Sequence, residues 1–225
     1  MSFEGRIEEF VFSEPLFKTI RHTYVLTCSS SPSYMPMMRQ LIHVKPTRYV
    51  TVFVSKPWRE KNDERITSVM DDIHMNHAAM YDRCKNIDEY ILVLEDDAVF
   101  WRTLARERHA IEEFLINKRP AVYLLGNLAT WTQRMGAHFR VRGAGATHGQ
   151  FLSLAARERW RCDGIQAYLL DRTKYTNRLD CAANPNSQMH GKSHEVYAYI
   201  RPIVTQTFNM SENRTIWNAT LTSIQ

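Results

Sequence analysis

The sequence contains no apolar run of the roughly 18 residues that a membrane-spanning helix needs. The N-terminal segment MSFEGRIEEF also lacks the apolar core of a signal peptide. We therefore expect a cytoplasmic protein with no membrane span, unless the chain is a fragment of a longer one. The 4 cysteines are widely spaced and form no CxxC pair, which argues against a disulfide framework or a zinc knuckle. We expect them to be reduced.

Runs of like charge and low-complexity linkers are also missing. The net charge of +5 favours anionic partners, but the basic residues are spread along the chain, so we expect no nucleic-acid partner. A length of 225 residues with 44% hydrophobic content suits one large domain with a substantial core.

The most informative stretch is DEYILVLEDDAVF, residues Asp88–Phe100. Its branched apolar run stops abruptly at three acids, Glu95, Asp96 and Asp97. Such a run predicts a strand buried on both faces, with the acids at its carboxyl end, where open α/β sheets bind ligands. Three adjacent carboxylates repel one another, which favours a bound hard divalent cation. A solvated acidic turn is the alternative.

Other apolar patterns alternate between strand and helix along the first half of the chain. Strands are predicted at His22–Cys28, Tyr49–Val54 and Ala121–Leu125, the last ending at Gly126. Helical spacing covers residues 37–42, 66–84 and 104–115. Beyond residue 126 we expect short antiparallel strands at 139–141 and 149–154, a helix at 155–161 and a last strand at 196–204. The alternation predicts a doubly wound α/β sheet.

The order of the segments TYVLTCS, NHAAMYDRC, YILVLEDDAVF, AVYLLGNL, THGQFLSLAAR and RPIVTQTFNMSEN resembles that of GT-A glycosyltransferases. It is most similar to glycosyltransferase family 25 and to related enzymes of large DNA viruses that glycosylate their capsids. The similarity spans residues 22–212, and LEDD is its specific block. It implies a single GT-A-like (Rossmann-like) domain with a mixed, mainly parallel central sheet flanked by helices. Residues 20–126 would be the nucleotide-sugar-binding half, 127–205 the acceptor-side half and 206–225 a polar tail.

The resemblance also implies roles for the acids, as a variant of the DxD motif. Asp97 would ligate Mn²⁺ (or Mg²⁺), Glu95 would assist directly or through water, and Asp96 would contact the ribose. A cation bridging the two phosphates would stabilise the charge that develops on the departing nucleotide diphosphate.

Further donor-side roles follow from the same alignment of segments. Thr27 and Cys28, at the end of the first core strand, would line the nucleotide pocket. His77 would touch the base, although its place on an apolar helical stripe fits a packed core histidine equally well. Arg59 and Arg83 are candidates for binding the donor phosphates, with a solvated surface role as the alternative.

The sequence departs from the family where a catalytic base is expected. An inverting transfer needs a carboxylate to deprotonate the acceptor hydroxyl, but the family's aspartate aligns with Gln166, which cannot act as a base. Asp163 is the predicted substitute, with Asp171 and Asp180 as alternatives. A helix N-cap is the competing interpretation of Asp163.

Two later segments complete the predicted site. His190 is expected to complete the metal sphere, with His194 nearby and with two surface histidines as the alternative interpretation. Lys192 could neutralise the diphosphate if its loop closes as a lid. The segment Gly143–Gly149, GAGATHG, has the wrong spacing for a dinucleotide loop, so we expect a flexible acceptor loop there.

The sequence thus predicts a metal-dependent glycosyltransferase acting on a nucleotide-diphosphate sugar, UDP-linked rather than GDP-linked. Its acceptor would be a hydroxyl of a glycan or glycoprotein, with a viral capsid protein among the candidates. A nucleotidyltransferase remains open, although TCSSSPSYMP lacks the glycine-rich basic loop such enzymes usually carry. A basic module that binds nucleic acid or glycans without catalysis is the second alternative.

Overall fold

The computed structural model of the chain describes residues 3–61, 66, 69–87, 89–159, 196–200 and 203–206. The strands are β1 (Gly5–Val11), β2 (His22–Cys28), β3 (Tyr49–Ser55), β4 (Ile91–Glu95), β5 (Ala98–Phe100), β6 (Val122–Met135), β7 (His138–Leu152), β8 (Val196–Tyr199) and β9 (Val204–Gln206). The helices are α1 (Tyr34–Val44), α2 (Val69–Arg83), α3 (Leu104–Lys118) and α4 (Leu154–Arg159), with a 3₁₀ turn, η1 (Trp58–Lys61).

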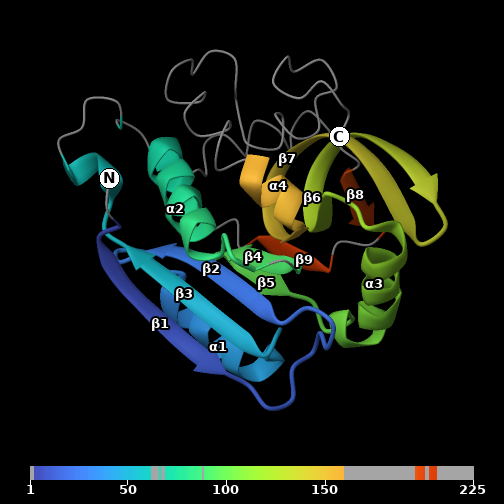
Figure 1. Cartoon of the computed structure of the whole chain (residues 1–225), viewed down its shortest axis with the longest axis horizontal. Coiled ribbons are helices and arrows are strands. Elements are labelled where there is room, and N and C mark those ends of the chain that lie inside the picture. The colour runs from blue at the N-terminus through green and yellow to red at the C-terminus, as the bar shows by residue number, and fades with distance from the viewer. Residues whose placement is uncertain are drawn as a thin grey trace.

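The main sheet has seven strands in the order β1-β3-β2-β4-β7-β6-β8. Its parallel part is β3-β2-β4, and β1 and β7 join this part antiparallel on either side. A second sheet pairs β5 with β9 (Figure 1). The predicted fold class, an α/β protein with a mixed central sheet flanked by helices, is confirmed. None of the helices in the described part of the chain is long and apolar enough to cross a membrane.

Both faces of the parallel part are covered, which explains its unbroken apolar runs. On β2, Tyr24 and Leu26 pack in one cluster with Met80 of α2, whereas Val25 packs on the other face with Leu41 of α1. Successive residues of a strand point to opposite faces, so a strand between two helical layers needs apolar residues at every position. The acids that begin at the last residue of β4 therefore mark the end of the buried strand.

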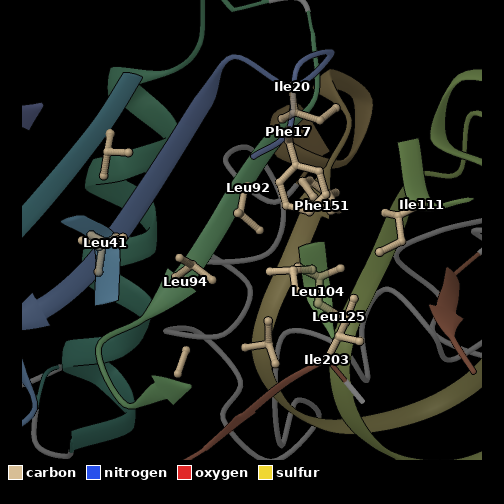
Figure 2. Packing of buried hydrophobic residues seen from close by; sticks show 14 of the residues in the cluster. Phe17, Ile20, Leu41, Leu92, Leu94, Leu104, Ile111, Leu125, Phe151 and Ile203 are labelled. Carbon is tan, nitrogen blue, oxygen red and sulfur yellow. The ribbon is translucent and has the colours of Figure 1, made fainter. Parts of the chain in front are cut away.

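The face covered by α1 and α3 holds the larger apolar cluster, which Figure 2 shows from close by. Leu92 and Leu94 of β4 point into it, and the segment before β2 contributes Phe17 and Ile20. Phe17 meets Phe151 of β7 edge to face, with the ring centroids 5.1 Å apart. Burying one such side chain stabilises a fold by about 1.5–3 kcal/mol, so this layer anchors β4 firmly.

Several predicted elements are confirmed with little change in their bounds. The strand β2 has the predicted bounds, and β3, β4 and the helices α1, α2 and α3 differ from prediction by a few residues. The predicted final strand is interrupted instead: β8 belongs to the main sheet and β9 to the small one. The strand β1 was not predicted, because it is a largely exposed edge strand whose residues do not alternate clearly.

In the middle of the chain, the strands predicted at 139–141 and 149–154 both fall on β7, which ends at Leu152, and the helix predicted at 155–161 corresponds to α4. Two other predictions were wrong. The strand that was expected to end at Gly126 continues as β6 to Met135, and the segment Gly143–Gly149 is part of β7 and not a loop. The two strands form one long antiparallel hairpin that turns at Gly136, whose φ of 65° suits glycine. Hydrogen bonds to the neighbouring strand outweigh the low strand propensity of the glycines here.

Candidate functional site

The candidate site lies where the three parallel strands end. Cys28 pairs with Ser55, the last residue of β3, and Leu26 pairs with Glu95, the last residue of β4. The strand register therefore brings Thr27 and Cys28 beside the acidic triplet at one edge of the sheet. This is the edge at which open α/β sheets bind their ligands.

The two aspartates form the tight turn that joins β4 to β5. The hydroxyl of Thr27 donates a hydrogen bond to Oδ2 of Asp96. Thr27 and Asp97 are buried, with only 4% and 8% of their surfaces exposed. A hydrogen bond from a buried hydroxyl to a carboxylate is stronger than a neutral one and fixes the orientation of the carboxylate. Asp96 is therefore held in place before any ligand arrives.

The electrostatics of the acidic turn are dominated by Glu95. Burial raises the pKa of Glu95 well above its usual value, and the neighbouring charges of Asp97 and Asp96 raise it further. Removal of a carboxylate from water and placement beside like charges both disfavour its ionised form. The fold therefore holds these carboxylates close together at this edge, and a bound cation would reduce the repulsion between their charges.

Hydrogen bonds hold the neighbouring backbone on both sides of the turn. The hydroxyl of Ser55 donates to the carbonyl of Thr27 at 3.1 Å, which ties the ends of β2 and β3 together. On the other side, the Gln40 side chain of α1 donates to the carbonyl of Ala98 at 3.1 Å and accepts from the N–H of Phe100 at 3.0 Å. A single amide side chain thus fastens β5 to α1.

Close packing brings β7 and β9 up to the same edge. Gly149 lies opposite Leu94 on β4. A Cβ atom at position 149 would lie 3.1 Å from Leu94 Cδ2 and 3.3 Å from Val204 Cγ1, closer than most such contacts. The missing side chain lets these strands approach the last residues of β4, which places β9 beside the acidic turn.

Comparisons with known proteins assign no family to the chain. No protein-family model and no curated protein sequence matches it. Solved structures that are similar include a putative glucose-1-phosphate thymidylyltransferase from Bacillus anthracis, at a TM-score of 0.39 and 9% identity over 90% of this chain and 94% of that one. A mannose-1-phosphate geranyltransferase from Thermus thermophilus gives 0.39 and 11% over 80% and 74%. A glycosyltransferase involved in glycosylation of the PBCV-1 major capsid gives 0.38 and 12% over 79% and 94%.

Likenesses at this level do not identify a function, so any functional conclusion depends on the residues of the site. Among the described residues, no three His, Cys, Asp or Glu side chains converge in a way that could hold a metal ion by themselves. That is compatible with Mn²⁺ or Mg²⁺ at a nucleotide site, because such hard cations are often bound by one or two carboxylates together with phosphate oxygens and water. The hard oxygen donors of Asp97 and Glu95 fit this mode of binding.

Arg59 reaches the same edge, but it is already engaged. It follows β3 in the turn η1, and its Nε lies 3.4 Å from Oδ2 of Asp72 on α2. The backbone N–H of Arg59 also donates to Oδ1 of Asp72 at 2.9 Å. Asp72 therefore orients this arginine at the rim of the edge, and its contact with donor phosphates stays a prediction.

Two other predicted residues do not join the acids. Arg83 ends α2, the helix that leads to the amino end of β4, and pairs with Glu9 of β1 at 3.0 Å. It is therefore on the side of the sheet away from the acidic turn. His77 lies on α2 itself and is completely buried, with Nδ1 3.3 Å from the hydroxyl of Tyr81 on the same helix. That environment agrees with the alternative interpretation of His77, a packed core histidine on the apolar side of a helix.

Gln150 is a polar residue near the acids that was not predicted from the sequence. It lies on β7 directly opposite Val93, and therefore on the same face as Glu95, two residues farther along β4. Diagonal neighbours of this kind are about 7–8 Å apart. Gln150 is 2% exposed, and its Oε1 has no hydrogen-bond partner within the described part of the chain. The one available signal was a glutamine inside an otherwise apolar predicted strand.

The remaining predicted residues lie outside the described part of the chain. They are the candidate base Asp163 with its alternatives Asp171 and Asp180, and the late-loop residues His190, Lys192 and His194. Their roles stay predictions. The described edge accordingly comprises a donor-side group of Thr27, Cys28, Glu95, Asp96 and Asp97, with Arg59 at its rim.

Proposed function

We propose that this chain is a metal-dependent glycosyltransferase that moves a sugar from a nucleotide-diphosphate sugar, UDP-linked in the first instance, to a hydroxyl of a glycan or glycoprotein. The observation that carries the proposal is the crowding of Glu95, Asp96 and Asp97 at the carboxyl edge of three parallel strands. Nucleotides bind at such edges, and crowded carboxylates favour a divalent cation.

Each described residue has a definite part in this scheme. Asp97 and Glu95 would hold Mn²⁺ or Mg²⁺, whose positive charge stabilises a departing nucleotide diphosphate. Asp96, kept in place by the hydroxyl of Thr27, would accept hydrogen bonds from the ribose hydroxyls. Thr27 and Cys28 would form the floor of the nucleotide pocket at the end of β2.

The acceptor side is proposed on the sequence alone. Asp163 is our candidate for the base and His190 for the late metal ligand. The sequence resemblance makes a viral capsid protein one candidate acceptor. The fold and the acidic edge support binding of the donor, and they do not indicate which acceptor is used.

The direct test measures UDP release from a panel of UDP-sugars by the full chain with and without Mn²⁺. Loss of several kcal/mol of charge stabilisation should lower metal-dependent release by roughly a hundredfold or more in Asp97→Asn. Glu113→Gln, which alters an exposed acid on α3, is the matched control and should retain activity. Release of UDP that is unaffected by Asp97→Asn would disprove the proposal.

The same assay separates a transferase of sugars from a transferase of nucleotides. A nucleotidyltransferase joins a nucleoside triphosphate to a sugar 1-phosphate and releases pyrophosphate, whereas the proposed enzyme releases a nucleoside diphosphate from a sugar nucleotide. Incubation with UTP and sugar 1-phosphates, followed by a pyrophosphate assay, should give no product. Metal-dependent pyrophosphate release that Asp97→Asn abolishes would replace the glycosyltransferase with a nucleotidyltransferase.

A further inference from the structure

A basic hollow lies at the opposite end of the sheet from the acidic turn. Its volume is about 860 Å³, within the range of small-molecule sites. The segment between β1 and β2, the end of α1 with the turn that follows, and Arg108 of α3 form its walls. Figure 1 shows the segment between β1 and β2 passing from α1 to α3. Since β2 has 7 residues, the hollow and the acidic turn are about 20 Å apart.

Cationic side chains from all three walls line this hollow. They are Lys18, Arg21, Lys45, Arg48 and Arg108, and His43 also lines the hollow. The one carboxylate in the lining is Glu14. Within the described part of the chain, none of the lining lysines and arginines is ion-paired with a carboxylate. The lining therefore carries a large uncompensated positive charge.

The walls are held by hydrogen bonds and are not formed by freely moving side chains alone. The backbone N–H of Leu16 donates to the carbonyl of Lys45 at 2.8 Å, and that of Phe17 to the carbonyl of Pro46 at 2.9 Å. The segment between β1 and β2 is thereby fixed to the turn after α1. A rigid frame lowers the entropic cost of binding a ligand.

A buried acid fastens the same segment to α3. Oε1 of Glu112, which is 6% exposed, accepts hydrogen bonds from the backbone N–H groups of Lys18 and Thr19 at 2.7 and 2.8 Å and from the Thr19 hydroxyl at 2.8 Å. Arg108 lies one helical turn before Glu112 on the same side of α3. Glu112 therefore brings Lys18 and Arg108 to the same part of the hollow, and its own charge is used in holding the turn.

Two guanidinium groups of the lining each contact the same aromatic ring. The Cζ atoms of Arg21 and Arg48 lie 5.7 and 5.5 Å from the centroid of the Tyr49 ring. Cation–π contact of this kind orients arginine side chains that would otherwise move freely in solvent. An oriented guanidinium group matches the geometry of phosphate oxygens, which it binds in a bidentate manner.

We propose that this hollow binds a compact anion carrying several phosphoryl groups, and that it does so independently of the acidic edge. Several cations that converge on one concavity from three segments suit a small, highly charged ligand. A nucleic-acid strand needs an extended basic stripe along its backbone, whereas these cations surround a single concavity.

The test uses tripolyphosphate as the probe and the full chain at physiological ionic strength, with EDTA present so that the acidic edge holds no cation. Calorimetry should show saturable binding by the natural sequence. The double variant Arg21→Gln/Arg48→Gln should bind at least about tenfold more weakly, because each guanidinium contributes charge-assisted hydrogen bonds. Both arginines are exposed, so the variant should fold normally, which its melting curve will show.

The matched control, Arg39→Gln/Lys85→Gln, removes two exposed charges outside the hollow and should change the affinity by no more than about twofold. Equal losses in the two double variants would mean attraction by net charge alone and would overturn the proposal, as would the absence of binding by the natural sequence. A single-stranded DNA oligonucleotide should bind more weakly than tripolyphosphate. Tighter binding of the oligonucleotide, lost in the Arg21/Arg48 variant, would replace the compact ligand with nucleic acid.

Discussion

At the scale of single residues, Thr27 has the most direct effect on the acidic turn. Its hydroxyl donates to Asp96, and its backbone carbonyl accepts a hydrogen bond from Ser55. The residue is buried, so water cannot replace the hydroxyl without opening the edge of the sheet. The position of Asp96 therefore depends on a neighbouring strand as well as on the turn that carries it.

Replacing Thr27 with valine keeps its shape and removes the hydroxyl. Thr27→Val should lower the free energy of unfolding by about 1–3 kcal/mol, because a half-buried carboxylate loses a donor from a buried hydroxyl. If Asp96 binds the ribose, the KM for the donor should also rise while kcat changes less. Urea unfolding and steady-state kinetics measure the two effects, and Thr27→Ser, which keeps the hydroxyl, should restore both. A KM that is the same in all three proteins would rule out a positioning role.

The sequence predicted the residues of this edge but not the contacts between them. Glu95, Asp96 and Asp97 were predicted because they follow an apolar run, and Thr27 because it lies at the end of another predicted strand. The hydrogen bond between Thr27 and Asp96 joins residues 69 positions apart, and no local pattern carries that information. Arg83 was predicted to join this edge but does not. Its helix, α2, leads to the amino end of β4, which is the end away from the acids.

At the scale of elements, the short helix α4 controls the approach to β4 through one buried arginine. Arg157 is 2% exposed. It donates hydrogen bonds to the carbonyls of Cys84, Ile87 and Glu89 at 2.8, 2.6 and 2.7 Å. These carbonyls belong to the connection from α2 to β4, and that of Cys84 also accepts from the backbone N–H of Ile87 at 3.1 Å. A single guanidinium thus orders the chain that leads into the acid-bearing strand.

Arg157→Met should therefore be among the more damaging single substitutions in the chain. It keeps the apolar stem but removes three charge-assisted hydrogen bonds to the carbonyls of Cys84, Ile87 and Glu89, which should cost about 3 kcal/mol or more. For a chain of this length that corresponds to a fall of roughly 6 °C or more in melting temperature. Differential scanning calorimetry is the measurement, and Arg39→Met on the exposed side of α1 is the control. A similar small change in both variants would mean that water replaces the guanidinium.

The elements also divide into those that a local pattern can predict and those that it cannot. The strands β2, β3 and β4 are buried on both faces, so each is marked by an unbroken apolar run. The strand β7 contains three glycines between residues 143 and 149, which locally favour a loop. Its extended form depends on pairing with β4, β6 and β8, and such long-range pairing lies outside any local window.

At the scale of the whole molecule, the central sheet separates two oppositely charged ends. The carboxyl end of β4 carries the acids, beside the end of β2, and the amino ends of β2 and β3 directly follow Arg21 and Arg48 of the hollow. Parallel strands make this separation possible, because all of their carboxyl ends meet at one edge and all of their amino ends at the other. The net charge of the chain reveals neither site, since it averages over both.

Two separate sites should respond independently to variants, because substitutions more than about 10 Å apart with no shared partner usually act additively. The increase in melting temperature caused by UDP with Mn²⁺ should disappear in Asp97→Asn and persist in Arg21→Gln/Arg48→Gln. The increase caused by tripolyphosphate in EDTA should show the reverse pattern. Binding stabilises the folded state in proportion to the logarithm of ligand concentration over Kd, so each increase reports on one site. Loss of both responses in either variant would mean that the two ligands share one site, and the acidic turn and the basic hollow could then not be separate.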